Sequence, residues 1–221
     1  MINIMIVHYN TPDLTECLVK SINKFTPDSK IYIFDNSDKL PFVAKFDNVE
    51  VIDNTNGEII DFIKFRKRFI RTDEPFYSPK HCYTIQKFID LYNIPFILLD
   101  SDVLLKKDIS ELYDERYAFI GGYRRKRIAP FICFINSEKL KQSGVKYFDE
   151  NHMLGINGST EDTGCMLYRN EDKLEHRIID FNDYIEHYSG GSYDQKIFNM
   201  LHRGQATKEE WLKQHKDLYN E

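Results

Sequence analysis

The sequence predicts an α/β protein with a mainly parallel central sheet and helices on both faces. In residues 1–105, short apolar runs alternate with segments whose apolar residues recur at helical spacing. Strands joined by helices in this way pair in parallel, because each helix carries the chain back across the sheet. The composition agrees: 42% hydrophobic and 14% aromatic residues against 29% charged residues are typical of an ordered globular chain.

Four strands and three helices are expected in this first part of the chain. The predicted strands are the apolar runs at 2–7, 31–34, 49–52 and 96–99. Thr11-Pro12-Asp13 predicts the start of the first helix, because threonine caps helices, proline suits the first helical position and an acid suits the first turn. Further helices are predicted around 59–70 and from Ser78-Pro79 onward, the latter with Ile85, Phe88 and Ile89 facing the core.

The second half of the chain is less regular. Strands are predicted at 117–120, 128–135 and 178–181, and helices from Ser137 and at 161–168. Asp108-Ile109-Ser110-Glu111 resembles a capping box and predicts a helix start there. A tail helix over 208–219 carries Trp211 and Leu212 on one face, which we expect to dock on the domain rather than on a membrane or a partner.

Charge and cysteine usage exclude several classes of protein. With 30 Lys+Arg against 35 Asp+Glu the net charge is −5, which argues against a nucleic-acid partner. The apolar runs are much shorter than the roughly 20 residues that span a bilayer, and the first residues lack the basic region of a signal peptide. The four cysteines lack the spacing of a disulfide framework or a zinc site. We therefore expect a cytoplasmic protein with reduced cysteines.

The segment FILLDSDVLL is the most informative in the chain. It places Asp100 and Asp102 at the carboxyl end of an apolar strand, where open α/β sheets bind ligands. Two carboxylates flanking one small residue can hold a divalent cation together with substrate phosphates. One of the acids could instead cap the next helix, but Asp108 is already placed to do so. The pair therefore predicts metal or nucleotide binding.

FILLDSDVLL resembles the DxD segment of nucleotide-sugar glycosyltransferases with the GT-A fold, a Rossmann-like fold. MINIMIVHYNTPDLTECLVKSI followed by IYIFDNSD is similar to the opening of family-2-type enzymes. The resemblance is clearest over residues 2–105. It implies one glycosyltransferase domain over 1–221, with a nucleotide-sugar-binding half (1–105), an acceptor and catalytic half (106–205) and a C-terminal helix (206–221).

The resemblance also implies a nucleotide pocket at the first two strand ends. Tyr9, Asn10, Thr11 and Asp35 would hold the base and ribose, with Asp100 contributing at the end of the fourth strand. A carboxylate at a strand end can accept hydrogen bonds from a ribose or a base. Asp35 could instead form an Asx turn within FDNSD. Gly57 and Asp61 are further candidates for the same pocket.

A second group of candidates lies in DYIEHYSGGSYD. The resemblance implies that His187 completes a metal site with Asp100 and Asp102, and that Gly190 and Gly191 approach the diphosphate through backbone N–H groups. The alternative is a histidine with only a structural task.

The resemblance further implies an acidic general base at a helix start near residue 161. Asp162 is the candidate, with Glu161 as second choice. Acids also favour a first helical turn for purely electrostatic reasons, so a structural role is the alternative.

Two basic clusters and one helix start remain. The cluster at 64–71 is expected to be a solvated helix face, whereas Arg124-Arg125-Lys126-Arg127 could be a solvated loop, bind an acidic acceptor or lean on an anionic membrane. Ser78, Lys80 and His81 could face the donor, since their helix precedes the DxD strand.

The expected function is transfer of a sugar from a nucleoside diphosphate sugar to a hydroxyl of a glycan or lipid-linked acceptor, as in polysaccharide biosynthesis. Mn²⁺ or Mg²⁺ would be the cofactor, and peripheral association with the inner face of the membrane is compatible with such an acceptor. The alternatives are a sugar-nucleotide nucleotidyltransferase and a non-catalytic nucleotide-binding module of the same fold. Inverting and retaining stereochemistry both stay open.

Overall fold

The computed structural model describes residues 1–54, 77–153, 162–188 and 205–220. The helix predicted around 59–70 and the basic cluster at 64–71 lie outside the described residues, as do five candidates: Gly57, Asp61, Glu161, Gly190 and Gly191.

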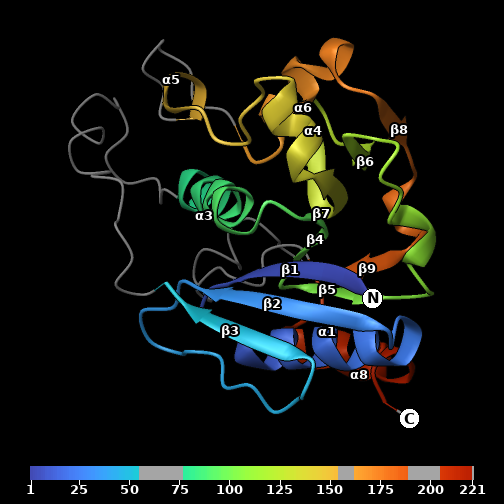
Figure 1. The fold of residues 1–221 in the computed structure, drawn as a ribbon. Helices are drawn as coiled ribbons and strands as arrows, with labels where there is room; N and C mark the ends of the chain where they lie inside the picture. Colours follow the sequence, from blue (N-terminus) through green and yellow to red (C-terminus); the bar gives the residue numbers. More distant parts are fainter. Residues whose placement is uncertain (55–76, 154–161, 189–204, 221) are drawn as a thin grey trace.

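A seven-stranded sheet forms the centre of the molecule, with the order β3-β2-β1-β4-β7-β6-β8 (Figure 1). Its strands are β1 (Ile2–His8), β2 (Ser29–Asp35), β3 (Val49–Asp53), β4 (Pro95–Asp100), β6 (Phe119–Tyr123), β7 (Ile128–Asn136) and β8 (His176–Ile178). All neighbours pair in parallel except the two pairs that β7 makes, with β4 and with β6. The predicted mainly parallel α/β sheet is confirmed.

Helices cover both faces of this sheet, because alternate side chains of each buried strand point to opposite sides. On one face, Ile4, Ile6 and Ile33 pack with α1 (Pro12–Phe25). On the other face, Met5 and Phe34 belong to the cluster that includes α3 (Tyr77–Tyr92), α4 (Ser137–Gln142) and α6 (Cys165–Arg169). In Figure 1, α1 and α3 accordingly lie on opposite sides of the strands.

Sequence signals account for the two long helices. Thr11 is the N-cap of α1 and Pro12 occupies its first position, as predicted. The predicted core residues of α3, Ile85, Phe88 and Ile89, are at most 1% exposed.

A small second sheet and the tail complete the described fold. β5 (Val103–Leu105) pairs with β9 (Ile185–His187) in antiparallel fashion. Tail helix α8 (Lys208–Gln214) begins with a capping box between Thr207 and Glu210. Its Trp211 packs with Leu14, Leu104 and Tyr188, so the predicted docking of the tail on the domain is confirmed. The remaining short elements are α5 (Glu150–Met153) and 3₁₀ turns at Ser110–Leu112, Glu171–Lys173, Phe181–Asp183 and Lys216–Leu218.

Several predicted boundaries are wrong. The strand predicted at 178–181 is β8 at His176–Ile178, and Asp180 then caps a 3₁₀ turn by accepting a hydrogen bond from the Asn182 amide. The helix predicted at 161–168 starts only at Cys165. Asp108 accepts from the amide and hydroxyl of Ser110, which starts a 3₁₀ turn rather than a capping-box helix.

All four cysteines are free, as expected, and three of them are buried. Burial raises the pKa of Cys82 to about 12, so this thiol stays protonated near neutral pH. Among the described residues, none of the helices is both long and apolar enough to traverse a bilayer.

Candidate active site at the strand ends

The sheet topology creates a ligand-binding edge at β1 and β4. The connection from β1 leads to β2 on one side, whereas β4 pairs with β1 on the other side. β1, β2 and β4 are parallel, so their last residues, His8, Asp35 and Asp100, lie at the same edge of the sheet. In open α/β sheets this point of reversal is where ligands bind.

Asp100, Asp102 and His187 meet at this edge. One ligand atom from each lies within 4.8 Å of the others. Asp100 is the last residue of β4, and Asp102 directly precedes β5. Because β5 pairs with β9, Val103 stands opposite His187, and the Tyr188 amide donates to the Asp102 carbonyl at 2.8 Å. Two residues 85 positions apart are thus held side by side by a strand pairing.

One oxygen of the Asp100 carboxylate has no hydrogen-bond partner among the described residues. This atom, Oδ1, is buried, and the same holds for Nε2 of His81, which lies 3.5 Å from it. Burial raises the pKa of Asp100; His81 is the largest opposing influence, and the nearby Asp102 raises the pKa further. A bound cation would give this oxygen its missing partner. The donor set of two carboxylates and one imidazole fits a divalent cation such as Mn²⁺ or Mg²⁺.

One residue of β7, Phe131, and one of the turn before it, Arg124, lie next to Asp100, Asp102 and His187. The Phe131 ring packs on the His187 ring with centroids 3.9 Å apart. The Arg124 guanidinium lies over the same Phe131 ring, with its Cζ 4.7 Å from the ring centroid. The basic turn 124–127 therefore lies beside the candidate metal residues.

Asp162 lies at the same edge of the sheet, and the backbone conformation of Gly164 allows the chain at this point to approach β7 closely. It forms an ion pair with Arg127, and its Oδ1 accepts from the Thr163 amide at 2.8 Å. Gly164 has φ +83°, and a Cβ there would stand 2.0 Å from the Ile128 carbonyl oxygen, so only glycine fits against the start of β7. Asp162 precedes the N-cap Gly164 by two residues, so it is not in the first turn of α6.

The four residues predicted to hold the nucleotide have different surroundings. Asp35 is 3% exposed; its two oxygens accept from the amides of Ser37 and Phe42 at 2.8 and 2.7 Å. The Asx-turn alternative therefore describes its geometry. Asn10, at φ 55°, accepts from the amides of Lys39 and Leu40. The hydrogen bonds of both side chains thus stabilise the loop that follows β2.

Tyr9 and Thr11 lie nearer to the other candidates. The ammonium of Lys80 is 5.6 Å from the Tyr9 ring centroid, and the Thr11 hydroxyl lies 3.3 Å from the Ser101 hydroxyl between the two aspartates. Lys80 also donates to the Asn36 carbonyl at 3.1 Å, and burial lowers its pKa. Lys80 and His81 of α3 thus face the strand ends, whereas the side chain of Ser78 lies outside the described part.

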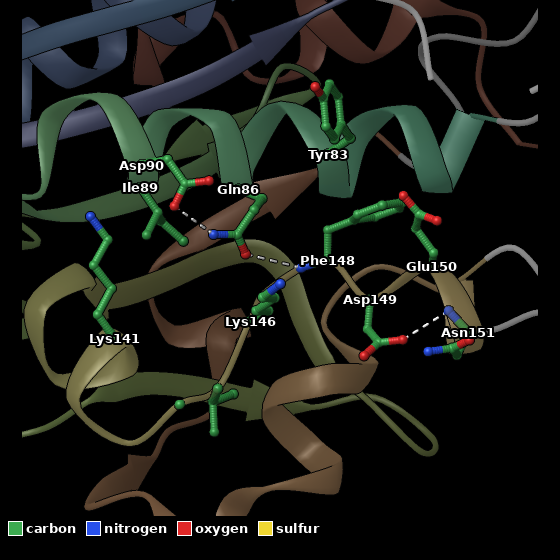
Figure 2. A pocket seen from close by; sticks show the side chains of 12 residues that line it. Tyr83, Gln86, Ile89, Asp90, Lys141, Lys146, Phe148, Asp149, Glu150 and Asn151 are labelled. Carbon is green, nitrogen blue, oxygen red and sulfur yellow. Dashed lines mark hydrogen bonds between the residues drawn. The ribbon is translucent and has the colours of Figure 1, made fainter. Parts of the chain in front are cut away.

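A cavity of about 660 Å³ lies away from this cluster, between α3 and residues 144–151 (Figure 2). Gln86 joins the two walls, because its Oε1 accepts from the Tyr147 and Phe148 amides. Its Nε2 donates to Asp90 of the same helix, and Figure 2 shows Gln86 between Asp90 and Phe148. Because His81 is on the same helix, this bridge helps to fix the helix that brings His81 to Asp100.

Sequence reasoning missed Phe131 and the contact of Arg124 with it. In the sequence, Phe131 is indistinguishable from an ordinary core residue of an apolar strand. No sequence signal marks this position, because it results from the antiparallel pairing of β7 with β4, which brings the start of β7 next to the DxD segment. For His81, the position of its helix directly before the DxD strand predicted the correct edge of the sheet, but it did not predict the contact with Asp100.

No family model matches the sequence, and no curated protein matches it. The structure does match solved glycosyltransferases. It aligns with the galactosyltransferase LgtC in complex with donor and acceptor sugar analogues with a TM-score of 0.51 and 12% identity, over 81% of this chain and 74% of LgtC. A structure of an active-site mutant of LgtC gives the same TM-score and identity over 73% of that chain.

A bifunctional enzyme, WbbM, aligns with a TM-score of 0.50 and 10% identity, over 81% of this chain and 39% of WbbM. Such identities establish the fold alone. The chain has the GT-A-type fold of these glycosyltransferases, as its DxD segment and opening strands predict.

Proposed function

We propose that the protein transfers a sugar from a nucleoside diphosphate sugar to a hydroxyl of a glycan or lipid-linked acceptor. The observation that carries this proposal is the meeting of Asp100, Asp102 and His187 at the strand-end edge of a GT-A-type sheet. The structural match to LgtC, which was solved in complex with donor and acceptor sugar analogues, supports transfer from a sugar donor to an acceptor.

In this proposal Asp100, Asp102 and His187 hold Mn²⁺ or Mg²⁺. When bound, such a cation supplies Lewis-acid stabilisation of the negative charge that develops on the departing diphosphate. Tyr9 and Thr11 contact the nucleotide, while Asn10 and Asp35 shape the loop beside it through the hydrogen bonds described above. Gly190 and Gly191, which follow His187 in the sequence, are kept as candidates for the diphosphate.

Asp162 is the proposed general base for the acceptor hydroxyl, with Glu161 as the sequence-based second choice. The ion pair with Arg127 and the Thr163 amide fix the orientation of its carboxylate. A carboxylate oxygen has two lone pairs, so each oxygen can still accept the proton of an acceptor hydroxyl. The side chain is 51% exposed, which leaves it open to a second substrate.

The setting of the reaction is part of the proposal. Four free cysteines agree with a reducing compartment, which supports the cytoplasm, and the basic turn 124–127 agrees with an acceptor at the inner face of an anionic membrane. Synthesis of a polysaccharide is the process that such a transfer would serve.

The test is a thermal-shift panel of UDP, GDP, CDP, ADP and dTDP with Mn²⁺ and with EDTA. One diphosphate should raise the melting temperature with Mn²⁺ and do so much less with EDTA, because without a cation the diphosphate and the two carboxylates repel each other. No shift with any of the five in Mn²⁺ would contradict the proposal.

A further inference from the structure

Arg124 is a half-buried cation for which the described residues provide no acidic partner. Its guanidinium rests on the Phe131 ring and makes no hydrogen bond or ion pair among them, although Arg127 in the same turn pairs with Asp162. A guanidinium has five N–H donors, and those of Arg124 are not among the buried polar atoms, so they are open to a ligand from solvent. Such a group is suited to an anion that arrives from outside the chain.

The turn holds this guanidinium in place next to the candidate metal residues. The Arg124 amide donates to the Arg127 carbonyl at 3.0 Å, and Arg125 has φ 59°, which closes the hairpin between β6 and β7. Phe131, 5% exposed, packs on Arg124 and also on His187. The ring of Phe131 is therefore the side chain that lies between the Arg124 guanidinium and His187 of the candidate metal residues.

The charges around Arg124 favour an anion as well. Burial lowers its pKa first, and the neighbouring Arg127 and Arg125 lower it further, while Asp162 and Asp100 act in the opposite direction. A bound anion would relieve this repulsion among three guanidinium groups.

We propose that Arg124 binds a phosphate group of the nucleoside diphosphate beside the Asp100, Asp102 and His187 cluster. This rests on the proposed function and adds to it a protein cation that shares the diphosphate charge with the metal. Arginine suits this task, because its planar N–H groups match two phosphate oxygens at once. A phosphate carried by the acceptor is the other source of the same chemistry.

Inorganic pyrophosphate with Mg²⁺ is the probe, because it contains the diphosphate without any base or sugar. Its affinity is measured by calorimetry for the wild type and for Arg124→Gln, Arg124→Lys and Arg125→Gln. Arg125 is the matched control, since it carries the same charge on the same turn but is exposed. Arg124→Gln should weaken binding by about tenfold or more and Arg124→Lys by less, whereas Arg125→Gln should change it less than about twofold.

Equal losses in Arg124→Gln and Arg125→Gln would overturn the proposal, because they would indicate only a general effect of charge. If Arg124→Gln left pyrophosphate binding unchanged but weakened binding of glucose 1-phosphate, the acceptor would be the source of the phosphate, and the proposal would again be wrong. If the wild type bound no pyrophosphate, the proposed function would fail together with it. Melting temperatures of all variants show whether each is folded.

Discussion

Asp162 illustrates how one residue can support two interpretations. Its ion pair with Arg127 could be a surface contact that contributes about 1 kcal/mol or less to stability. Through Arg127 it also lies beside the start of β7 at the strand-end edge, where the proposed transfer needs an acceptor base. The helix-dipole alternative loses its basis, because α6 starts at Cys165 and Asp162 lies outside the first turn. The two remaining interpretations differ in what its removal does to turnover.

Asp162→Asn should lower turnover by about two to four orders of magnitude, the usual contribution of one positioned base. Donor affinity should stay near the wild-type value, because a base for the acceptor does little to hold the donor. Transfer rate, donor affinity and melting temperature are measured on the same preparation. Wild-type turnover with a slightly lowered melting temperature would show that the ion pair is only structural.

His8 predicts a dependence of stability on pH. It is fully buried, with Nδ1 2.9 Å from the Thr15 hydroxyl and Nε2 3.2 Å from the Leu40 carbonyl oxygen. Burial lowers its pKa from 6.5, so the unfolded chain binds a proton at a higher pH than the folded one. The free energy of unfolding should therefore fall as the pH drops below 6.5, until the pH passes the lowered pKa of the folded protein.

Urea unfolding of the wild type and of His8→Gln at several pH values between 5 and 7.5, a range of about one unit around the histidine value, checks this. Glutamine can make neutral hydrogen bonds but does not titrate. The wild type should lose up to about 1.4 kcal/mol per pH unit more than the variant in this window. Parallel pH profiles for the two proteins would contradict the account of His8.

At the scale of elements, the positions of His187 and Asp102 depend on helix α8, which contributes no candidate ligand of its own. α8 places Trp211 against Tyr188, with ring centroids 5.3 Å apart. The Tyr188 amide in turn binds the Asp102 carbonyl, and Tyr188 directly follows His187. Residues that support metal ligands in this way commonly affect the affinity for the metal.

Trp211→Ala should therefore weaken Mn²⁺ binding by about tenfold, although residue 211 is no candidate ligand. It should also lower the free energy of unfolding by about 3 to 5 kcal/mol, because it removes a buried aromatic side chain. Trp211→Phe keeps a ring against Tyr188 and should retain most of the affinity. A folded Trp211→Ala protein with wild-type Mn²⁺ affinity would disprove the support by α8.

The segment before α6 depends on one glycine. Gly164→Ala should destabilise the protein by clearly more than the roughly 1–2 kcal/mol of a left-handed backbone, because its Cβ also collides with the Ile128 carbonyl oxygen. Gly144→Ala is the matched control, since Gly144 has φ +69° but open space around it. Thermal or urea unfolding compares the two variants. Equal losses would show that the contact with β7 contributes nothing.

At the scale of the whole molecule, the pattern of neighbouring residues correctly predicted those elements that form from residues close in sequence. The apolar strands, Pro12 at the helix start and the inward face of α3 follow from residues close in sequence, and the structure confirms them. The family resemblance also predicted the correct fold. The error at 178–181 has a clear reason: the apolar pair Ile178-Ile179 suggested a strand, but parallel pairing with β6 involves His176–Ile178.

Contacts across the chain could not be predicted from pattern alone. The sequence offered the Asx turn of Asp35 as an alternative, and the structure shows it. The task of Asn10 in the loop after β2, and the second bond of Asp35, became visible only with the hydrogen bonds from backbone amides near residue 40. The closeness of His187 to Asp102 requires the pairing of β5 with β9, which no local signal in either short strand specifies. The role of His187 as a metal ligand was implied by the family resemblance, whereas its position beside Asp102 is a result of the strand pairing.

The most direct test of the account is calorimetric titration of Mn²⁺ into the wild type, Asp102→Asn, His187→Ala and Asp53→Asn. Asp53 is the matched control, because it ends β3 at the same sheet edge but is not part of the cluster. We expect one Mn²⁺ site in the wild type and in Asp53→Asn, with binding lost in Asp102→Asn and weakened by about tenfold or more in His187→Ala. Equal Mn²⁺ affinity in all four folded proteins would contradict the proposed metal site.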